Sequence, residues 1–415
     1  MIRKLIGKLI DKATGKTGGK KTRLGKRVEI GEETHGIDPA LLDDDAVSVV
    51  RTLRAAGYEA YIVGGAVRDL LLGLKPKDFD VATNATPEEV KRLFRRAYIV
   101  GRRFRIVHVV FGRWRAKARA VIEVSTFRAW IDNEEAERIA ADERSARQLA
   151  GVKHAVDESG RVLRDNVWGP QIEDAARRDF SVNAMYYEPE SRILVDYHGG
   201  LADARARCIR MIGEPAARYR EDPVRILRAV RFAAKLAHLG FELDAATARP
   251  LKRSLPLLAD VPPSRMFDEM LKLLQTGHAE ASVQTLRQLG LQKGVYPLLD
   301  LIVQRADEPL VRAALHDSDR RIAAGRPVTA SFLLACVLWQ DVRAAWQQRL
   351  EQGEHATPAL HAAIDEVFGA HVGEVSGRGR LGAEMRDIWL MQPRFEKRTG
   401  ASAHSLAAQQ RFRAA

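Results

Sequence analysis

The segment that most constrains the fold runs from Ile62 to Thr83 and reads IVGGAVRDLLLGLKPKDFDVAT. Its apolar start is typical of a buried strand. Gly64 and Gly65 allow the backbone to turn tightly and to approach a ligand closely. A helix is expected from Ala66, with its first amides facing whatever lies above the turn. The segment therefore predicts a strand, a turn and a helix that together bind phosphate.

Three charged side chains follow this turn. Arg68 is in the first helical turn, where its guanidinium is expected to donate charge-assisted hydrogen bonds to a phosphate oxygen. Asp78 and Asp80 are two residues apart on an expected short strand, so their carboxylates face the same way. Two converging carboxylates suit one or two Mg²⁺ ions, which otherwise take water and substrate phosphate as ligands. An Asp-x-Asp pattern alone is common and is more often a solvated strand end, so the prediction depends on the whole segment.

Glu123 lies inside the strand-like run Val121–Val124. A charged side chain within such a run needs a partner. Two interpretations are open from the pattern alone. The carboxylate either joins Asp78 and Asp80 at a metal site, where the metal supplies the compensating charge, or it faces water from an edge strand.

A second block, RRDFSVNAM, covers Arg177–Met185. It sets basic side chains beside an acid and an amide, a combination able to hold phosphate, a ribose hydroxyl and metal-bound water. The alternative interpretation is a helix with an ordinary ion pair between arginine and aspartate.

A third block, EDPVRILRAVRF, covers Glu221–Phe232. Pro223 suits the first turn of a helix, and Asp222 suits its N-cap. Three arginines then recur every third residue along the same face as Asp222. They repel one another unless an anion or an acid lies against them, and the alternative is a solvent-facing stripe. These arginines are Arg225, Arg228 and Arg231.

In their order and letters, the three blocks resemble the motifs of the class II nucleotidyltransferases, the family of tRNA CCA-adding enzymes and bacterial poly(A) polymerases. Ser181 stands where the family usually has threonine, and it keeps the hydroxyl. The resemblance covers about residues 37–240. The carboxylates that it implies for catalysis with two Mg²⁺ ions are Asp78 and Asp80, with Glu123 or Asp179. The residues that it implies for nucleotide binding are Gly64, Gly65, Arg68, Arg178, Asn183, Asp222, Arg225, Arg228 and Arg231.

The segment 99–109, IVGRRFRIVHV, interleaves basic and aromatic residues as RNA-binding strands often do. A solvated turn is the simpler interpretation of Arg102, Arg103 and Arg105. The segment also resembles the signature that separates bacterial poly(A) polymerases from CCA-adding enzymes. His316-Asp317 is similar to part of the HD phosphohydrolase module, but the sequence lacks a convincing set of further metal ligands.

The resemblance implies transfer of AMP from ATP to the 3′ hydroxyl of RNA, with release of pyrophosphate. A CCA-adding or A-adding enzyme that acts on tRNA is the first alternative. A non-catalytic RNA-binding protein on a retired nucleotidyltransferase scaffold is the second. Clustered like charges at an intact site disfavour the second, because a dead site has no physical reason to keep them.

Helices and strands alternate up to about residue 188, and helical periodicity dominates after about residue 200. The expected fold is therefore α+β, with a nucleotidyltransferase head built on a mixed sheet and an all-helical neck, body and leg. We expect a basic mobile arm over 1–36, a catalytic head over 37–190, a helical neck with the base-reading and RNA-binding helix over 191–275, an RNA-binding body and leg over 276–390, and a basic tail over 391–415. About the last dozen residues are expected to be disordered.

The formal net charge of +13 points to a polyanionic partner. Part of the excess is local, because the first 27 residues hold ten lysines and arginines and one acid. No stretch approaches the ~20 apolar residues of a membrane span. The two cysteines suit a reducing cytoplasm. We expect a cytoplasmic monomer that binds RNA 3′ ends and ATP, with RNA-decay or RNA-chaperone proteins as candidate partners.

Overall fold

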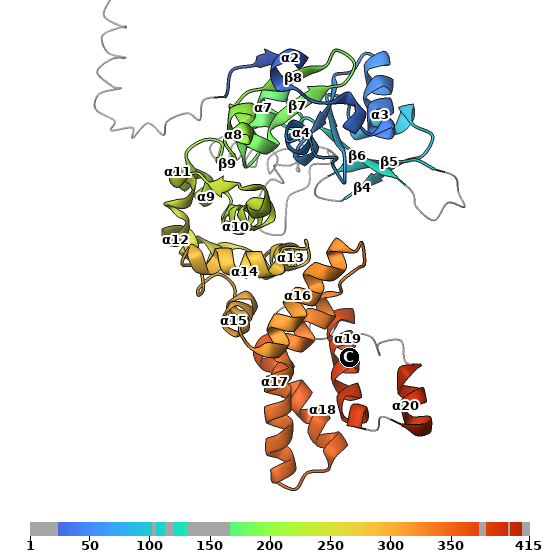
Figure 1. Ribbon diagram of the computed structural model, residues 1–415, viewed down its shortest axis with the longest axis vertical. Helices are drawn as coiled ribbons and strands as arrows, with labels where there is room; N and C mark the ends of the chain where they lie inside the picture. Colours follow the sequence, from blue (N-terminus) through green and yellow to red (C-terminus); the bar gives the residue numbers. More distant parts are fainter. Residues whose placement is uncertain are drawn as a thin grey trace, which may run out of the picture. The chain divides into compact units, whose positions relative to one another are not determined.

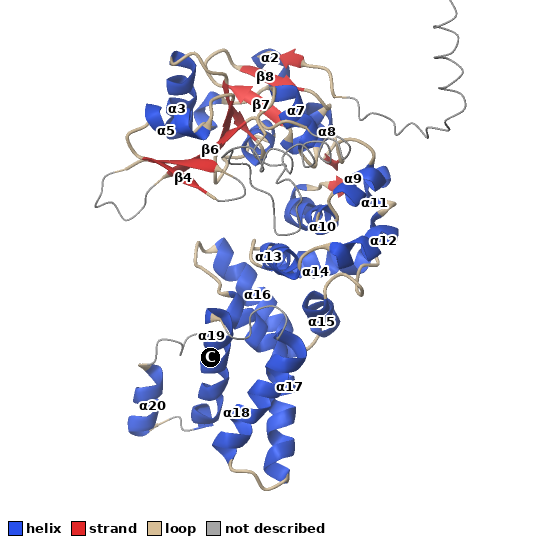
Figure 2. Ribbon diagram, turned by 180° about the vertical axis from the view of Figure 1, so that it is seen from behind, coloured by secondary structure: helices blue, strands red, loops and turns tan. Residues whose placement is uncertain are grey.

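The computed structural model describes residues 24–101, 105–112, 120–130, 167–372, 379–396 and 399–408. Two compact units divide the chain. The first comprises Met1–Ala202 and Ile212–Glu214, and the second comprises Asp203–Met211 and Pro215–Ala415. The first unit contains a mixed sheet with helices, and the second is almost entirely helical, as the colouring of Figure 2 shows. The α+β prediction is confirmed.

The sheet of the first unit has eight strands in the order β1-β8-β7-β2-β3-β6-β5-β4. Only β3 and β6 run parallel, and every other neighbouring pair is antiparallel. The parallel pair brings together two strands that are far apart in the sequence. The strand bounds are β1 Val28–Ile30, β2 Ala60–Val63, β3 Asp80–Thr83, β4 Ala97–Val100, β5 Ile106–Val110, β6 Val121–Thr126, β7 Met185–Glu188 and β8 Ile193–Asp196.

Two helices, α3 (Asp44–Ala55) and α5 (Pro87–Leu93), pack against one face of this sheet. The N-cap of α3 is Asp43, whose carboxylate accepts the Ala46 amide at 3.0 Å. The N-cap of α5 is Thr86, which forms a full capping box with Glu89. Strong caps on both helices fix where each one starts, and so which apolar side chains meet the sheet.

The opposite face of the sheet is covered in its middle by α7 (Gln171–Arg177), which contributes Ala175 to a buried cluster with the aromatic rings of Tyr61, Phe127 and Tyr186. Edge-to-face contacts join these rings, with centroids 6.0 Å apart in the pairs that Tyr186 makes with the other two. This cluster is the buried core on this face of the sheet, next to the strand β3. Two short elements, α4 (Gly65–Leu71) and the 3-10 helix η3 (Ser181–Asn183), contact each other in the same unit.

One row of directly opposed residues crosses seven strands on that face, and we call it the cross-strand row. It begins within the buried cluster, continues through Asp80, and ends at the edge strand β4. The first members are buried and the last is exposed. From β8 to β4 the row consists of Val195, Tyr186, Val63, Asp80, Glu123, His108 and Tyr98.

The second unit contains a pair of two-residue parallel strands, β9 (Cys208–Ile209) and β10 (Glu242–Leu243), and is otherwise helical. Its longest helix is α17, which packs against α16, α18 and α19 (Figure 1). The helices from residue 200 on are α8 Gly200–Arg205, which spans the boundary between the units, α9 Pro215–Glu221, α10 Arg225–Leu236, α11 Ala245–Ala248, α12 Leu251–Ser254, α13 Pro263–Leu274, α14 Ala279–Gln288, α15 Pro297–Arg305, α16 Pro309–Ala323, α17 Ala330–Glu351, α18 Ala356–Val367, α19 Arg380–Met391 and α20 Gly400–Ala407. In the described parts of the chain, no helix has the length and apolar character needed to span a membrane.

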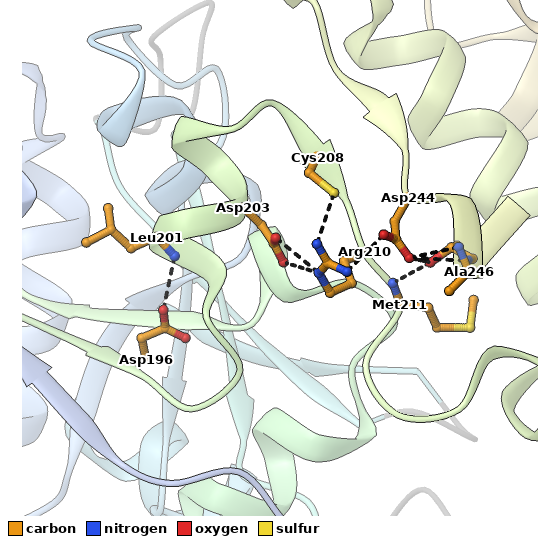
Figure 3. Close-up of polar contacts among 9 residues, drawn as sticks. Asp196, Leu201, Asp203, Cys208, Arg210, Met211, Asp244 and Ala246 are labelled. Atoms are coloured by element: carbon orange, nitrogen blue, oxygen red, sulfur yellow. Dashed lines mark hydrogen bonds and ion pairs between the residues drawn. The ribbon is translucent and has the colours of Figure 1, made fainter.

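Asp203, Arg210 and Asp244 form an ion-pair network near the start of the second unit. The Arg210 guanidinium donates to both carboxylate oxygens of Asp203, at 3.1 and 3.2 Å, and to Asp244 at 2.8 Å (Figure 3). Asp244 also accepts the amides at the start of α11, at 3.1 and 3.3 Å. Because the Asp244 carboxylate both pairs with Arg210 and caps α11, it links the segment before α9 to α11.

Both chain ends differ from the predicted organisation. Within the expected arm of residues 1–36, Val28–Ile30 form β1 and pair with β8, and Glu32–His35 form helix α2. Arg27 explains this order, because its guanidinium donates to Gln171 and to Tyr197 at 2.6 and 3.1 Å. At the other end, α20 reaches into the stretch expected to be disordered and buries Leu406.

Candidate active site

The glycine turn lies directly over two of the predicted site residues. Gly64 has a φ of +74°, a conformation that favours glycine. A Cβ placed on Gly64 would lie 3.8 Å from Asp80 Oδ2 and 3.9 Å from Arg178 Nη1. Helix α4 begins at Gly65, one residue earlier than expected. The structure thus brings together the turn of the first motif, its second aspartate and the arginine of the second motif.

Asp80 is the first residue of β3, and Asp78 lies two residues before it, outside the strand in which it was expected. Asp78 and Asp80 are exposed on either side of Phe79, which is 6% exposed. Asp78 is close enough for its charge to act on Asp80, and a common direction of the two carboxylates stays a prediction. Glu123 on β6 stands directly opposite Asp80 in the parallel ladder, which places it beside one of the two aspartates, and its membership of a metal site stays a prediction.

The electrostatics of Asp80 reflect this crowding. Although water reaches the carboxylate, the protein atoms around it and the negative charges of Glu123 and Asp78 raise its pKa to about 6, against the opposing effect of Arg178. Three like charges at one place repel one another, and a cation among them relieves that repulsion. The carboxylates are therefore arranged for a positively charged ligand.

The donor set fits Mg²⁺ in part. No three histidine, cysteine or acidic side chains within the described ranges converge as a ready metal cluster. Magnesium needs only one or two protein carboxylates and completes its octahedron with water and substrate phosphate. Glu123 is in addition 3.4 Å from His108 Nε2. Asp78, Asp80 and Glu123 thus suit a site that is complete only with the substrate present.

Arg68 and Asn183 join the first two motifs. Arg68 is almost fully buried, and its guanidinium donates to Asp69 at 2.7 Å and to Asn183 Oδ1 at 2.8 Å. Arg178 Nη1 donates to the backbone carbonyl of Asn183 at 3.1 Å. Asn183 is therefore held from both sides by arginines. The role of Arg68 as a phosphate ligand stays a prediction, since these bonds position Asn183.

Sequence analysis missed two residues that brace Arg178. Asp174 Oδ2 accepts from Arg178 at 3.1 Å and from the Tyr186 hydroxyl at 2.8 Å. The Arg178 guanidinium also lies 5.2 Å from the centroid of the Tyr186 ring. Burial raises the pKa of Tyr186 well above its usual range, so the hydroxyl stays a donor. The spacing of Asp174 four residues before Arg178 on α7 was the available signal.

Residues 196–200, Asp-Tyr-His-Gly-Gly, pack next to the second motif and fix the backbone there. Asp196 accepts the amides of His198 and Leu201, both at 3.0 Å, the second of which Figure 3 shows. A Cβ on Gly200 would lie 2.4 Å from the Ser181 carbonyl oxygen, so only glycine fits there. Asp179, next to Arg178, accepts the Ile212 amide through its backbone carbonyl at 2.9 Å. Whether its side chain takes part in catalysis stays a prediction.

The third motif lies in the second unit, and one local prediction about it was wrong. Helix α10 begins at Arg225 and its N-cap position is Val224, not Asp222. Asp222 Oδ2 instead accepts from Arg265 on α13 at 2.8 Å. The competing partner is 43 residues away in sequence and was invisible to a local capping rule. The other oxygen, Oδ1, is buried and has no hydrogen-bond partner among the residues that the structure describes.

The arginines of the third motif are not a solvent-facing stripe. The Arg225 side chain is 11% exposed and donates to Glu221 at 3.2 Å and to the Arg218 carbonyl at 2.9 Å. The Arg231 side chain is 17% exposed and lies 3.7 Å from Glu269 of α13. Arg228 is partly buried on the same helix. Acids from neighbouring helices therefore offset the repulsion within the stripe.

Two further predictions concern charged segments. Arg102 and Arg103 lie outside the described residues, and Arg105 forms an ion pair with Glu88 on α5. His316 lies 3.4 Å from Glu280. Its neighbour Asp317 pairs with two arginines of its own helix, Arg320 and Arg321. The rejection of a phosphohydrolase module is consistent with these ordinary ion pairs.

Three family descriptions match the chain. Residues 60–210 match the poly A polymerase head domain, residues 240–302 match the probable RNA and SrmB-binding site of polymerase A, and residues 352–415 match the polymerase A arginine-rich C-terminus. Poly(A) polymerase I of Salmonella typhimurium is 40% identical over 391 residues, which cover 93% of this chain and 79% of that protein.

More distant relatives carry the other activity of the family. The CCA-adding enzyme of Bacillus licheniformis is 35% identical over 248 residues, or 60% of this chain and 54% of that protein. A solved structure of a CCA-adding enzyme, apo form II, aligns with a TM-score of 0.54 at 19% identity and covers 89% of this chain and 76% of that one, which supports the fold alone. The chain belongs to the family of poly(A) polymerases and CCA-adding enzymes, which are nucleotidyltransferases.

Proposed function

We propose that the protein adds AMP from ATP to RNA 3′ ends without a template and releases pyrophosphate. One observation carries the proposal. The carboxylate of Asp80 stands in register beside Glu123 and beneath the Gly64 turn, where burial and the charge of Glu123 raise its pKa to about 6 and negative charge is concentrated. A polyphosphate with its metal ions is the ligand that such a concentration, next to the Arg178 guanidinium, is suited to bind.

Mg²⁺ ions held by Asp78, Asp80 and Glu123 would supply the charge that activates the 3′ hydroxyl and stabilises the departing pyrophosphate. The protein's own groups supply positioning. Arg178, fixed by Asp174 and Tyr186, presents a cation beside the carboxylates. The Gly64 turn leaves room for phosphate to approach the backbone closely. The proposal requires no covalent intermediate with the protein.

Base selection is proposed for the third motif. The buried Oδ1 of Asp222, which has no partner among the described residues, is an acceptor that suits an exocyclic amino group, while Arg265 donates to the other oxygen of that carboxylate. Adenine and cytosine carry such an amino group on the edge used for pairing, whereas uracil and the corresponding position of guanine present a carbonyl. Asp222 with Arg225 would therefore admit ATP and CTP and disfavour the other nucleotides.

This leaves CCA or A addition to tRNA as the second candidate, because an acceptor at Asp222 suits cytosine as well as adenine. The higher identity to poly(A) polymerase I, spread over nearly the whole chain, favours polyadenylation. We place the reaction in the cytoplasm and expect a monomer, with RNA-decay or RNA-chaperone proteins as candidate partners.

Primer extension tests the proposal. Purified protein, Mg²⁺ and a short labelled RNA without tRNA structure are given each nucleotide separately. A long ladder with ATP and little product with CTP supports polyadenylation. Addition that stops after one to three residues, and only on tRNA ends, moves the assignment to CCA addition. RNA binding without extension by any nucleotide leaves only the non-catalytic interpretation.

A further inference from the structure

The cross-strand row continues beyond the carboxylates onto a part of the sheet that is not buried. On β5 and β6, alternate side chains pack inward, with Val107, Val109, Ile122 and Val124 all buried. The residues between them face the other way and are half-exposed or exposed. Helix α5 contacts these same strands, which accounts for the buried side. The opposite side at β4, β5 and β6 is the one that also carries Glu123.

This uncovered face is apolar and aromatic. Three of the eight large hydrophobic side chains exposed in the described residues lie on it, namely Tyr98, Val100 and Val121. Tyr98 is 57% exposed, the highest value of the eight. Within the described part of the chain, its ring forms no aromatic contact and its hydroxyl no hydrogen bond. Clustered exposed apolar side chains are usually covered by a binding partner.

The register fixes how this face relates to the carboxylates. Tyr98 stands opposite His108, His108 opposite Glu123, and Glu123 opposite Asp80. Three strand spacings separate Tyr98 from Asp80, which is about 14 Å. At the ~3.4 Å rise of stacked nucleotides, that distance corresponds to about four nucleotides. Val100 and Val121 flank the row on either side, on β4 and β6.

We infer that the face formed by Tyr98, Val100, His108 and Val121 binds the last few nucleotides of the RNA that is extended, with a base stacked on the Tyr98 ring. This inference rests on the proposed function and deepens it. Exposed aromatic rings on a sheet face are the usual stacking platform for single-stranded RNA, because every base presents a π-face. The face leads in register to Asp80, where the 3′ hydroxyl must arrive.

Charge supports RNA over a protein partner. Arg95 and Arg96 are both exposed and precede Tyr98 at the start of β4, where they supply cations for backbone phosphates. The Val110 amide donates to the Arg96 carbonyl at 2.9 Å, so this basic pair is anchored to the same sheet. Arginines just before β4, beside the ring, and carboxylates three strands away suit an RNA strand that carries backbone phosphates and ends at a metal site.

The test measures RNA binding separately from catalysis. Fluorescence anisotropy with 5′-labelled oligoadenylate of twelve nucleotides, without ATP, compares the wild type with Tyr98→Ala, Tyr98→Phe and Tyr98→Leu. Loss of one stacked base should weaken binding about 5- to 100-fold in the alanine variant. The phenylalanine variant should stay within about twofold of the wild type. The leucine variant should behave like alanine, because it keeps apolar area without a π-face. Circular dichroism checks that each variant folds.

The chain offers a matched control at the other edge of the same sheet. Val28 on β1 is 47% exposed, and Val28→Ala should leave RNA affinity unchanged. In primer extension, Tyr98→Ala should raise the KM for a twelve-nucleotide primer by the same factor as the loss of affinity. It should leave the KM for ATP unchanged and affect a dinucleotide primer little, because a dinucleotide ends before it reaches the ring.

Several results would overturn the inference. Unchanged affinity in Tyr98→Ala excludes the platform. Full affinity in Tyr98→Leu shows an apolar contact typical of a protein partner. An equal loss of extension with the twelve-nucleotide primer and with the dinucleotide would show that Tyr98 acts on the carboxylate site and not on RNA upstream of it. If the wild type binds RNA through Tyr98 but extends no primer, the face is an RNA-binding platform, while the proposed function fails and so does the assignment of that RNA as the extended strand.

Discussion

Replacement of Asp80 by asparagine tests two effects of this carboxylate separately: how much its charge destabilises the folded protein, and how much it contributes to nucleotide transfer. The change Asp80→Asn keeps the shape of the side chain and removes one of the three clustered charges. We expect nucleotide transfer to fall by at least about 10³-fold, because an interaction of roughly 4 kcal/mol with the metal-bound substrate is lost. We also expect the metal-free protein to become more stable near neutral pH.

The size of the expected stability gain follows from the pKa of Asp80, which rises from an ordinary 3.8 to about 6. The folded protein thus holds this proton to a higher pH than the unfolded chain, so the ionised carboxylate destabilises the fold. The cost is absent below about pH 4, grows between pH 4 and 6, and is complete above pH 6. A shift of this size corresponds to about 3 kcal/mol, which we discount to about 1 kcal/mol because water screens the exposed group.

Thermal unfolding in EDTA measures this effect. At pH 7.5 the Asp80→Asn variant should melt about 2–4 °C above the wild type, and at pH 4 the two should coincide. Asp45→Asn is a matched control, since burial and the neighbouring Asp43 and Asp44 also raise the pKa of Asp45, far from the site. The control should retain transfer activity within about twofold. An Asp80→Asn variant that is less stable at pH 7.5 refutes the like-charge argument, and one that keeps a tenth of the activity refutes the catalytic assignment.

Three further changes probe the supports of the two units. Gly200→Ala should lower the free energy of unfolding by about 1–3 kcal/mol, because its methyl group would overlap the Ser181 carbonyl oxygen; an unchanged free energy in urea unfolding would contradict this close contact. Tyr186→Phe should cost about 1–2 kcal/mol and lower kcat with little change in KM for RNA, since Asp174 loses a donor at 2.8 Å; an unchanged kcat would exclude this positioning role. Asp319→Ala should cost about 1 kcal/mol, because Asp319 accepts the first two amides of α14 at 2.7 and 3.1 Å; hydrogen exchange at those amides should rise, and unaltered exchange contradicts the cap.

The sequence was sufficient wherever local rules decide the structure. The Gly64-Gly65 turn marked the end of β2 and the start of α4 to within one residue, and the apolar run Val121–Val124 marked β6. Each of these predictions uses residues within a few positions of one another. Such contacts form with little loss of chain entropy, so sequence spacing alone indicates them.

Long-range pairing accounts for what sequence analysis missed. Asp222 suits an N-cap by its neighbours, yet Arg265 from another helix takes its carboxylate. Residues 28–30 are too few to show the alternation of a strand, and their pairing with β8 supplies the missing stabilisation. The hydrogen bond from the Tyr186 hydroxyl to Asp174 depends likewise on where α7 lies on the sheet. Spacing along the chain holds no information about such partners.

The single parallel pair in the sheet has an evolutionary consequence. Asp80 and Glu123 are adjacent because β3 and β6 pair directly, while β4 and β5 form a hairpin that joins them in sequence and extends the sheet beyond β6. Insertions or deletions in the turns of that hairpin leave the β3–β6 register intact, whereas a one-residue slip within β6 turns Glu123 to the other face. The hairpin is therefore free to diverge among related enzymes and to change which RNA is accepted, while the chemistry of nucleotide transfer is inherited unchanged.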